Sequence, residues 1–345
     1  MIKDKVNNIL LIIKVMEEAL LSYGRPSIKH LILHVTNRCN MRCDHCFVDF
    51  DSPKKELSLD EIISISRKFS NLIWLDIGGG EPLMREDLDE IVSQFRFREL
   101  SIPTNGWESE QIVEKLKKIN SIASGKLIVT LSLDGMQETH DKIRRPESFE
   151  RTIQTFNELK QIKGLRIKFN TVLCEKNSDE IINLMHFVKE LEPDFHSVLM
   201  VRGTTRDPLM RLPSVDKIKI LEQSIYRIQQ SYNYGRTGML SKVQRNYQVY
   251  KGDLNVRTLQ ERRQVIPCLA GASHLVVWPE GDVSSCELLP PIGNIREKNI
   301  DELLKGVEMR ERLSSIRRGD CYCTHDCNMI ENILLNPKSY LRLLR

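Results

Sequence analysis

The sequence lacks a hydrophobic run long enough to span a membrane. Its longest apolar stretch covers only residues 9–13 and is followed by charged residues rather than by a small-residue cleavage site. Low-complexity tracts and repeats at a fixed period are also absent, which excludes a disordered chain and a solenoid. We therefore expect a globular cytoplasmic protein.

The composition allows one catalytic domain and a smaller second module. The chain has 345 residues, of which 41% are hydrophobic and 28% are charged. It also contains nine cysteines. Because the cytosol keeps thiols reduced, metal ligation or catalysis explains these cysteines better than a disulfide framework does.

Positive charge is concentrated in the middle of the chain. Residues 202–263 contain 13 Lys and Arg against 5 Asp and Glu, a balance of +8, whereas the whole chain carries +4. The rest of the chain is therefore slightly acidic. A solvated basic face would explain this segment, and so would an anionic ligand or partner.

Short apolar strands alternate with amphipathic helices from residue 29 onward. The expected strands are 31–35, 72–77, 99–103, 127–133, 167–173 and 195–201, and the expected helices are 59–70, 86–95, 109–120, 148–162 and 178–191. This rhythm is typical of the α/β class, here a partial (β/α)6 TIM-type barrel with helices outside. In such folds the reacting groups gather on the loops after the strands.

The chain is expected to divide into four segments. These are an N-terminal amphipathic helix (1–27), the barrel (28–201), a basic helical bridging segment (202–264) and a small module with a β-hairpin and a C-terminal helix (265–345). Packing against the barrel is the ordinary role for the N-terminal helix, and contact with a membrane surface is the alternative.

Three cysteines follow the first expected strand at C-x3-C-x2-C spacing: Cys39, Cys43 and Cys46. We expect them to project from one loop at the mouth of the barrel. Three cysteine ligands leave one iron of a four-iron cluster open, and an open iron can bind a substrate. The alternative is a structural zinc site with a distant fourth cysteine, because closed zinc sites have four ligands.

Glycine-rich or polar turns follow the next three expected strands. Their sequences are Gly78-Gly79-Gly80-Glu81, Thr104-Asn105-Gly106 and Ser132-Leu133-Asp134-Gly135. Glycines let a ligand approach the backbone, and the carboxylate of Glu81 can accept a hydrogen bond from an ammonium group. Beside the cysteine loop, these turns predict a ligand site.

Residues 28–201 resemble the radical S-adenosylmethionine superfamily, whose C-x3-C-x-Φ-C loop and GGE turn lie in a six-stranded partial barrel. The resemblance implies a [4Fe-4S] cluster on the three cysteines, with the open iron binding the amino and carboxylate groups of S-adenosylmethionine. It also implies that Gly79, Gly80 and Glu81 hold the methionine amino group. Electron transfer would then break a sulfur–carbon bond and yield a 5′-deoxyadenosyl radical.

The resemblance implies further contacts with the cofactor. Ser132 and Asp134 would touch its ribose or carboxylate, Arg144 would pair with the carboxylate, and Asn170 and Val172 would lie by the adenosyl group. The full set of further cofactor-binding residues is expected to be His45, Asn105, Ser132, Asp134, Arg144, Asn170 and Val172. At the first of these positions the family often has an aromatic residue.

A second group of cysteines lies near the C-terminus: Cys268, Cys286, Cys321, Cys323 and Cys327. The expected hairpin brings the first two together. Residues 265–330 resemble the SPASM and twitch extensions of radical S-adenosylmethionine enzymes, which implies one auxiliary [4Fe-4S] cluster rather than zinc. The full SPASM pattern has seven cysteines for two clusters, whereas five are present here. Which of the last three cysteines is not a ligand, and whether the cluster is redox-active or structural, stay open.

Cys174 is the one cysteine outside both groups. It follows the fifth expected strand in phase with Asn170 and Val172 under the two-residue alternation of strands, so we expect it to face the cofactor. A thiol there would return a hydrogen atom to a substrate radical. A lone cysteine is otherwise usually a small buried hydrophobe.

The leading hypothesis is a radical S-adenosylmethionine oxidoreductase or isomerase. It would abstract hydrogen from a peptide or an anionic small molecule, such as a sugar or nucleotide sugar, leading to oxidation, epimerisation or cross-linking. The stretch 202–206, after the sixth strand, favours a phosphate-bearing substrate. The expected partners are that substrate and an electron donor such as flavodoxin or ferredoxin, with no nucleic acid. The alternatives are a non-catalytic iron–sulfur electron-transfer or regulatory protein and a zinc-stabilised scaffold.

Overall fold

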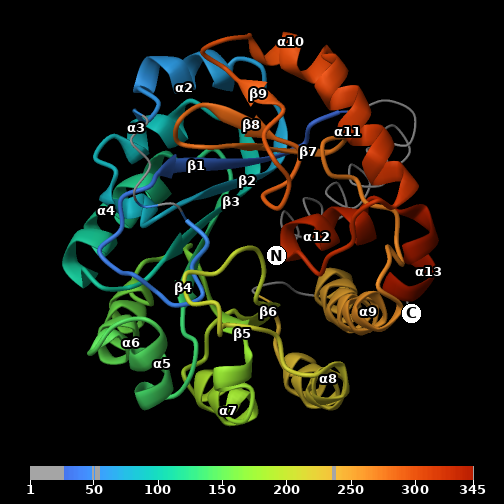
Figure 1. Cartoon of the computed structure of the whole chain (residues 1–345). Helices are drawn as coiled ribbons and strands as arrows, with labels where there is room; N and C mark the ends of the chain where they lie inside the picture. The colour runs from blue at the N-terminus through green and yellow to red at the C-terminus, as the bar shows by residue number, and fades with distance from the viewer. Residues whose placement is uncertain (1–26, 49, 51–54, 235–237, 345) are drawn as a thin grey trace.

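A computed structural model describes residues 27–48, 50, 55–234 and 238–344, and within them six parallel strands bend into an open barrel with helices outside (Figure 1). The strands are β1 (His30–Thr36), β2 (Leu72–Gly79), β3 (Phe97–Thr104), β4 (Lys126–Ser132), β5 (Arg166–Leu173) and β6 (Phe195–Met200). The outer helices are α2 (Leu59–Ser66), α3 (Leu88–Ser93), α4 (Ser109–Ile122), α5 (Gln137–Ile143), α6 (Ser148–Leu159) and α7 (Ile181–Glu190). The expected partial barrel is confirmed, and α5 is a helix that the sequence pattern missed.

The strands carry apolar residues on one face and polar residues on the other. In β1, Leu31, Leu33 and Val35 belong to the apolar core under the helices, whereas His30 and His34 face a cavity inside the barrel. This arrangement follows from the two-residue period of a strand. The barrel interior is therefore a cavity lined by both polar and apolar side chains rather than a packed core.

The expected C-terminal hairpin does not stand apart from the barrel. Its first strand, β7 (His274–Val277), pairs in parallel with β1, and β8 (Asp282–Ser284) and β9 (Gly293–Asn294) continue the sheet antiparallel. The strand order is β6-β5-β4-β3-β2-β1-β7-β8-β9. β7 thus covers the free edge of β1, whose backbone donors and acceptors would otherwise lack partners.

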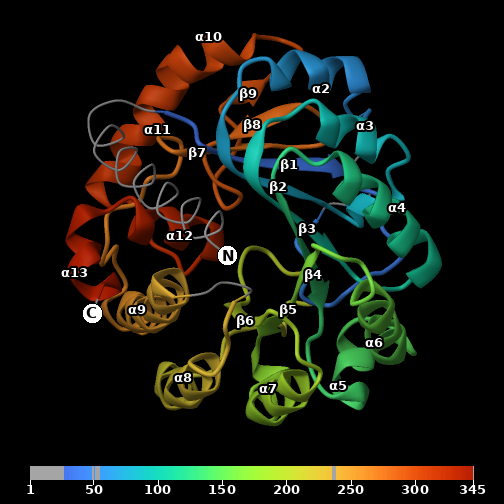
Figure 2. The same cartoon turned by 180° about the vertical axis from the view of Figure 1, so that it is seen from behind.

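The basic segment forms a bridge between barrel and C-terminal module (Figures 1 and 2). Helix α8 (Val215–Gln229) packs on β6 and α7, and α9 (Met239–Glu261) packs on α8, α12 (Asp326–Leu334) and α13 (Tyr340–Leu343). The module also contains α10 (Ile300–Lys305) and α11 (Val307–Arg318). Most basic side chains of the bridge that the structure describes are exposed. This exposure supports a solvated basic face as the explanation for the positive charge of residues 202–263. Arg202 is an exception, because it lines the cavity.

The N-terminal helix expected at residues 4–22 lies outside the described residues. Among the residues that are described, no helix is long and apolar enough to cross a membrane.

A buried carboxylate ties the C-terminal module to the barrel. Glu331 of α12 accepts hydrogen bonds from His30 Nδ1 of β1 (2.8 Å), from His274 Nδ1 of β7 (2.7 Å) and from the Ser273 hydroxyl. The second ring nitrogen of His30 lies 3.0 Å from a carboxylate oxygen of Asp76 in β2. Burial disfavours a charge on His30, yet Asp76 and Glu331 raise its pKa to about 9.

This network predicts an alkaline loss of stability. Because the folded-state pKa of His30 lies above its unfolded value of 6.5, its stabilisation is complete below pH 6.5 and is lost as the pH rises toward 9. The full contribution is about 3 kcal/mol. We expect His30→Gln to lower the thermal midpoint of the cluster-loaded protein at pH 6 and to weaken its decline with rising pH.

Lys298→Ala provides the control, because Lys298 forms only an exposed ion pair with Glu308. Its effect on unfolding should stay below about 1 kcal/mol at every pH. Equal midpoints for wild type and His30→Gln at pH 6 would contradict the role given to the network.

Candidate active site and cluster sites

One cavity of about 400 Å³ joins the cysteine loop after β1 to the interior of the barrel and to the C-terminal module. This volume lies in the usual range of small-molecule sites. Its wall contains residues from the inner faces of all six barrel strands and from α12. Two separate segments of the chain, far apart in sequence, therefore build the site.

The three cysteines of the first loop all line this cavity. Arg144 Nη1 lies 3.7 Å from Cys43 Sγ, and Asn105 Nδ2 lies 3.9 Å from Cys39 Sγ. Burial raises the pKa of Cys39 to about 11 and that of Cys43 to about 12. Such thiols ionise at neutral pH when a metal centre supplies positive charge, so this donor set fits an iron–sulfur cluster.

The GGE turn lies directly against the cysteine loop. Gly80 N donates to Thr36 O (2.8 Å), and a Cβ on Gly80 would lie 2.3 Å from Arg38 O, so a larger residue would push the two segments apart. Gly79 has φ +128°, a conformation that side chains rarely adopt. These two glycines bring the end of β2 to the wall of the cavity.

Glu81 is 3% exposed, and its two carboxylate oxygens accept hydrogen bonds from Asn105 N (2.8 Å) and Leu83 N (3.3 Å). Burial raises its pKa to about 7, although the hydrogen bond from Asn105 opposes the shift. Glu81 lines the cavity but also holds the turns after β2 and β3 together. The Glu81 carboxylate therefore lines the cavity and also fixes the two turns that form this part of its wall.

Arg144 reaches the cavity because Asp134 holds it. Asp134 is fully buried, and its carboxylate accepts from Arg144 Nε (2.5 Å) and from Val172 N (2.7 Å). Asp134 is not on the cavity wall, so it supports Arg144 rather than reaching a cofactor itself. His45, 3.6 Å from Asp134, does line the cavity, and burial lowers its pKa to about 4. Its imidazole is therefore neutral.

Ser132, Asn170 and Val172 also line the cavity, where the resemblance expects the adenosyl and ribose groups. Asn170 Oδ1 is buried and has no hydrogen-bond partner among the described residues. A buried amide oxygen without a partner is costly. S-Adenosylmethionine offers donors at its ribose and adenine, so this atom fits the cofactor.

Cys174 does not face the cavity. It is 0% exposed and packs with Ile143, Val201 and Met210. The alternation of β5 stops at Leu173, and Cys174 begins a short 3-10 turn, so the phase shared with Asn170 and Val172 no longer applies. The structure therefore gives Cys174 the packing role of a small buried hydrophobe.

Four of the five C-terminal cysteines line a second cavity of about 170 Å³: Cys268, Cys286, Cys321 and Cys323. Asn328 Nδ2 lies 3.4 Å from Cys286 Sγ and 3.8 Å from Cys323 Sγ. Although burial opposes it, hydrogen bonding and charge from His274 lower the pKa of Cys286. Four thiols with N–H donors around them fit one fully ligated cluster.

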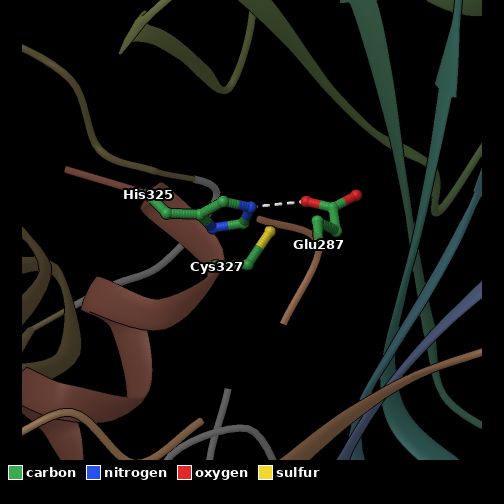
Figure 3. A group of neighbouring side chains, drawn as sticks. All are labelled: Glu287, His325 and Cys327. Carbon is green, nitrogen blue, oxygen red and sulfur yellow. Dashed lines mark hydrogen bonds and ion pairs between the residues drawn. The ribbon is translucent and has the colours of Figure 1, made fainter. Parts of the chain in front are cut away.

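Cys327 lies apart from these four, on the wall of the larger cavity. Its sulfur is 3.9 Å from Asp76 Oδ2 and lies near Glu287 and His325 (Figure 3). The structure thus groups four of the five cysteines around the second cavity and places Cys327 on the wall of the other.

Glu287 is the centre of a network that sequence reasoning missed. Its carboxylate meets His34 Nε2 (2.9 Å), His325 Nε2 (2.5 Å) and Arg202 Nη2 (3.1 Å). The sequence does show that Glu287 directly follows Cys286 and that His325 lies between Cys323 and Cys327. The contact between Glu287 and His34 of β1 depends on the pairing of β1 with β7, which no local sequence pattern predicts.

Comparison with known proteins agrees with this geometry. Residues 33–188 match the model of the radical SAM superfamily, and residues 268–328 match the iron-sulfur cluster-binding domain called SPASM. The AdoMet-dependent heme synthase of Methanosarcina barkeri is 29% identical over 300 residues, which cover 81% of this chain and 82% of that protein. A GTP 3′,8-cyclase of Helicobacter pylori is 27% identical over 237 residues, covering 60% and 72%.

Solved structures share the fold. Streptococcus suis SuiB bound to its precursor peptide SuiA has a TM-score of 0.63 at 16% identity, covering 89% of this chain and 71% of that one. The enzyme anSMEcpe with bound AdoMet has a TM-score of 0.60 at 15% identity, covering 92% and 98%. The chain thus belongs to the radical S-adenosylmethionine superfamily and carries a C-terminal SPASM domain, with S-adenosylmethionine, a [4Fe-4S] cluster and auxiliary iron–sulfur as its cofactors.

Proposed function

We propose that this enzyme abstracts a hydrogen atom from a peptide or amino-acid-like substrate bound between the barrel and α12. The observation that carries the proposal is a single cavity whose wall holds the three cysteines at one side and charged groups of both modules elsewhere. A cluster bound to Cys39, Cys43 and Cys46 supplies the electron that cleaves S-adenosylmethionine. A one-electron donor of the flavodoxin or ferredoxin class provides that electron.

The residues of the chain have separate tasks in this proposal. Arg144, fixed by Asp134, pairs with the carboxylate of S-adenosylmethionine, and the Gly79–Gly80 backbone takes its amino group. Asn170 Oδ1 accepts from the nucleoside. These contacts orient the cofactor so that its 5′ carbon meets a substrate held further along the cavity.

The charges on the wall support a substrate with amino and hydroxyl groups. Beyond the cofactor end, the cavity is lined by His30 and His34 and by six further charged side chains: Asp76, Glu99, Lys168, Arg202, Glu287 and Asp326. Four of these six are acidic, and each of the four carboxylates has a basic partner: His30 for Asp76, Arg166 for Glu99, Arg202 for Glu287 and Lys251 for Asp326. Paired carboxylates keep lone pairs that accept from N–H and O–H groups, and a peptide offers such donors. SuiB, which binds a precursor peptide, shares the fold.

An anionic small molecule is the second candidate. Lys168 on the wall favours it, since its ammonium group presents positive charge inside the barrel. Oxidation, epimerisation and cross-linking are all compatible with this first hydrogen abstraction.

The first test is cofactor cleavage. After anaerobic reconstitution with iron and sulfide, dithionite and S-adenosylmethionine should yield 5′-deoxyadenosine and methionine, measured by liquid chromatography with mass detection. Metal analysis should give about eight irons per chain for two four-iron clusters. Eight irons without 5′-deoxyadenosine would instead favour the electron-transfer alternative, and zinc in place of iron would favour the scaffold.

The second test concerns Arg144. Arg144→Lys keeps the charge beside Asp134 but loses the planar fork that can hold two acceptors. We expect the Kd for S-adenosylmethionine to rise by about tenfold, equivalent to about 1.4 kcal/mol. Equilibrium dialysis with the reconstituted protein measures this change, while iron content stays at the wild-type value.

Arg145→Lys is the matched control, because Arg145 is the exposed neighbour that stacks 3.9 Å above Trp107. Its Kd should equal that of the wild type. An unchanged Kd for Arg144→Lys would exclude Arg144 from the cofactor site.

A further inference from the structure

Lys168 is the one basic side chain on the wall of the reaction chamber, the larger of the two cavities, that has no carboxylate partner among the described residues. Each of the other basic side chains on that wall contacts a carboxylate: His30, His34, His45, Arg144 and Arg202. Lys168 is half-buried and forms no hydrogen bond or ion pair with the part of the chain that the structure describes. Its positive charge is therefore available to a ligand.

A hydroxyl without a partner lies beside Lys168. Thr130 of β4 is the register partner of Lys168 in β5, and both side chains line the cavity. Thr130 is 1% exposed, and its Oγ1 has no hydrogen-bond partner among the described residues. A buried hydroxyl is costly unless a ligand supplies that partner. Thr130 and Lys168 thus indicate one polar ligand group, shared by two adjacent strands.

This pair lies deeper in the barrel than the residues proposed for the cofactor. Ser132 and Asn170 form the next register pair that lines the cavity, two residues closer to the carboxyl ends of β4 and β5. Two residues of a strand span about 7 Å. A group bound by Thr130 and Lys168 is therefore set apart from the nucleoside contacts and belongs to the substrate.

The charge of this pair favours a carboxylate over a phosphate. A carboxylate carries one negative charge, and its oxygens accept hydrogen bonds from an ammonium group and from a hydroxyl. A phosphate monoester carries a charge of about −1.5 to −2 at neutral pH. Lys168 alone would leave part of that charge uncompensated inside the barrel, because the other basic side chains of the wall already contact carboxylates.

We propose that Lys168 and Thr130 form a binding site for a carboxylate group of the substrate, which makes Lys168 a specificity-determining residue. This inference rests on the proposed function and names its substrate class: a molecule of amino-acid or peptide type that enters the barrel with a carboxylate leading. The ammonium group of Lys168 compensates the charge, and the Thr130 hydroxyl donates a hydrogen bond. Fixing one end of the substrate in this way holds its reacting carbon in one orientation toward the cofactor.

The test measures the binding of matched probes to the reconstituted holoenzyme, with S-adenosylmethionine present and no reductant, so that no turnover occurs. N-Acetylglycine has a free carboxylate, whereas N-acetylglycinamide has nearly the same shape without the charge. Calorimetry or ligand-observed NMR should show that the wild type binds the acid at least about tenfold more tightly than the amide, because a charge-assisted hydrogen bond is lost with the amide. Lys168→Met should bind both probes equally, and Lys168→Arg, which keeps the charge, should retain the preference.

A second pair of probes identifies where the carboxylate comes from. Aspartate and asparagine, each capped as N-acetyl amide, differ only in a side-chain carboxylate. A preference for the acid in the glycine pair assigns the site to a terminal carboxylate, and a preference in the aspartate pair assigns it to a side chain. Either preference supports the site if Lys168→Met abolishes it.

Lys163→Met is the matched control, because Lys163 is exposed, precedes β5 and does not line the cavity. It should keep the wild-type preference, and the iron content of every variant should equal that of the wild type. Equal affinity for acid and amide in both pairs would overturn the inference, as would an unchanged preference in Lys168→Met or tighter binding of inorganic phosphate than of either acid. Absence of 5′-deoxyadenosine from the wild type with dithionite would instead contradict the proposed function, whatever the probes bind.

Discussion

The pairing of β7 with β1 is the constraint on which the site depends. It places the C-terminal module at the edge of the barrel, and the buried carboxylate of Glu331 joins α12 to the histidines of both strands. A buried acceptor shared by two histidines is costly to break, because each ring would lose its partner. The cavity therefore has a fixed wall, built by α12, opposite the barrel.

The same seam connects the two iron–sulfur sites. His274 lies beside the ligand Cys286, Glu331 links it to His30, and His30 contacts Asp76 on the cavity wall. A continuous row of buried polar groups thus runs from the auxiliary site to the reaction chamber. The second cavity and the wall of the larger cavity therefore share one buried hydrogen-bond network.

Local patterns predicted the barrel well because strands and helices have short periods. All six barrel strands lie within two residues of their expected ends, and the cysteine loop and GGE turn fall where parallel strands end. The same local patterns gave a wrong orientation just past the end of a strand. Cys174 was placed by extending the alternation of β5 past its last residue. The cofactor contact of Asp134, by contrast, came from the family resemblance, and the structure pairs its carboxylate with Arg144.

Long-range pairs could not be predicted from the sequence. Glu287 meets His34 across 253 positions and Arg202 across 85, and no spacing rule links them. The basic segment shows the same difficulty, since its excess charge suggested a binding surface, whereas most of the charge is exposed on a bridge and only Arg202 lines the cavity.

The division of labour among the C-terminal cysteines follows from helix geometry. Cys321 and Cys323 precede α12 in a segment without regular secondary structure and line the second cavity, whereas Cys327 is the second residue of the helix. The start of α12 turns the chain, so Cys327 points to the opposite side from its neighbours in sequence. Asn328, the next residue, turns back toward Cys286 and Cys323. One helix turn therefore contacts both cavities.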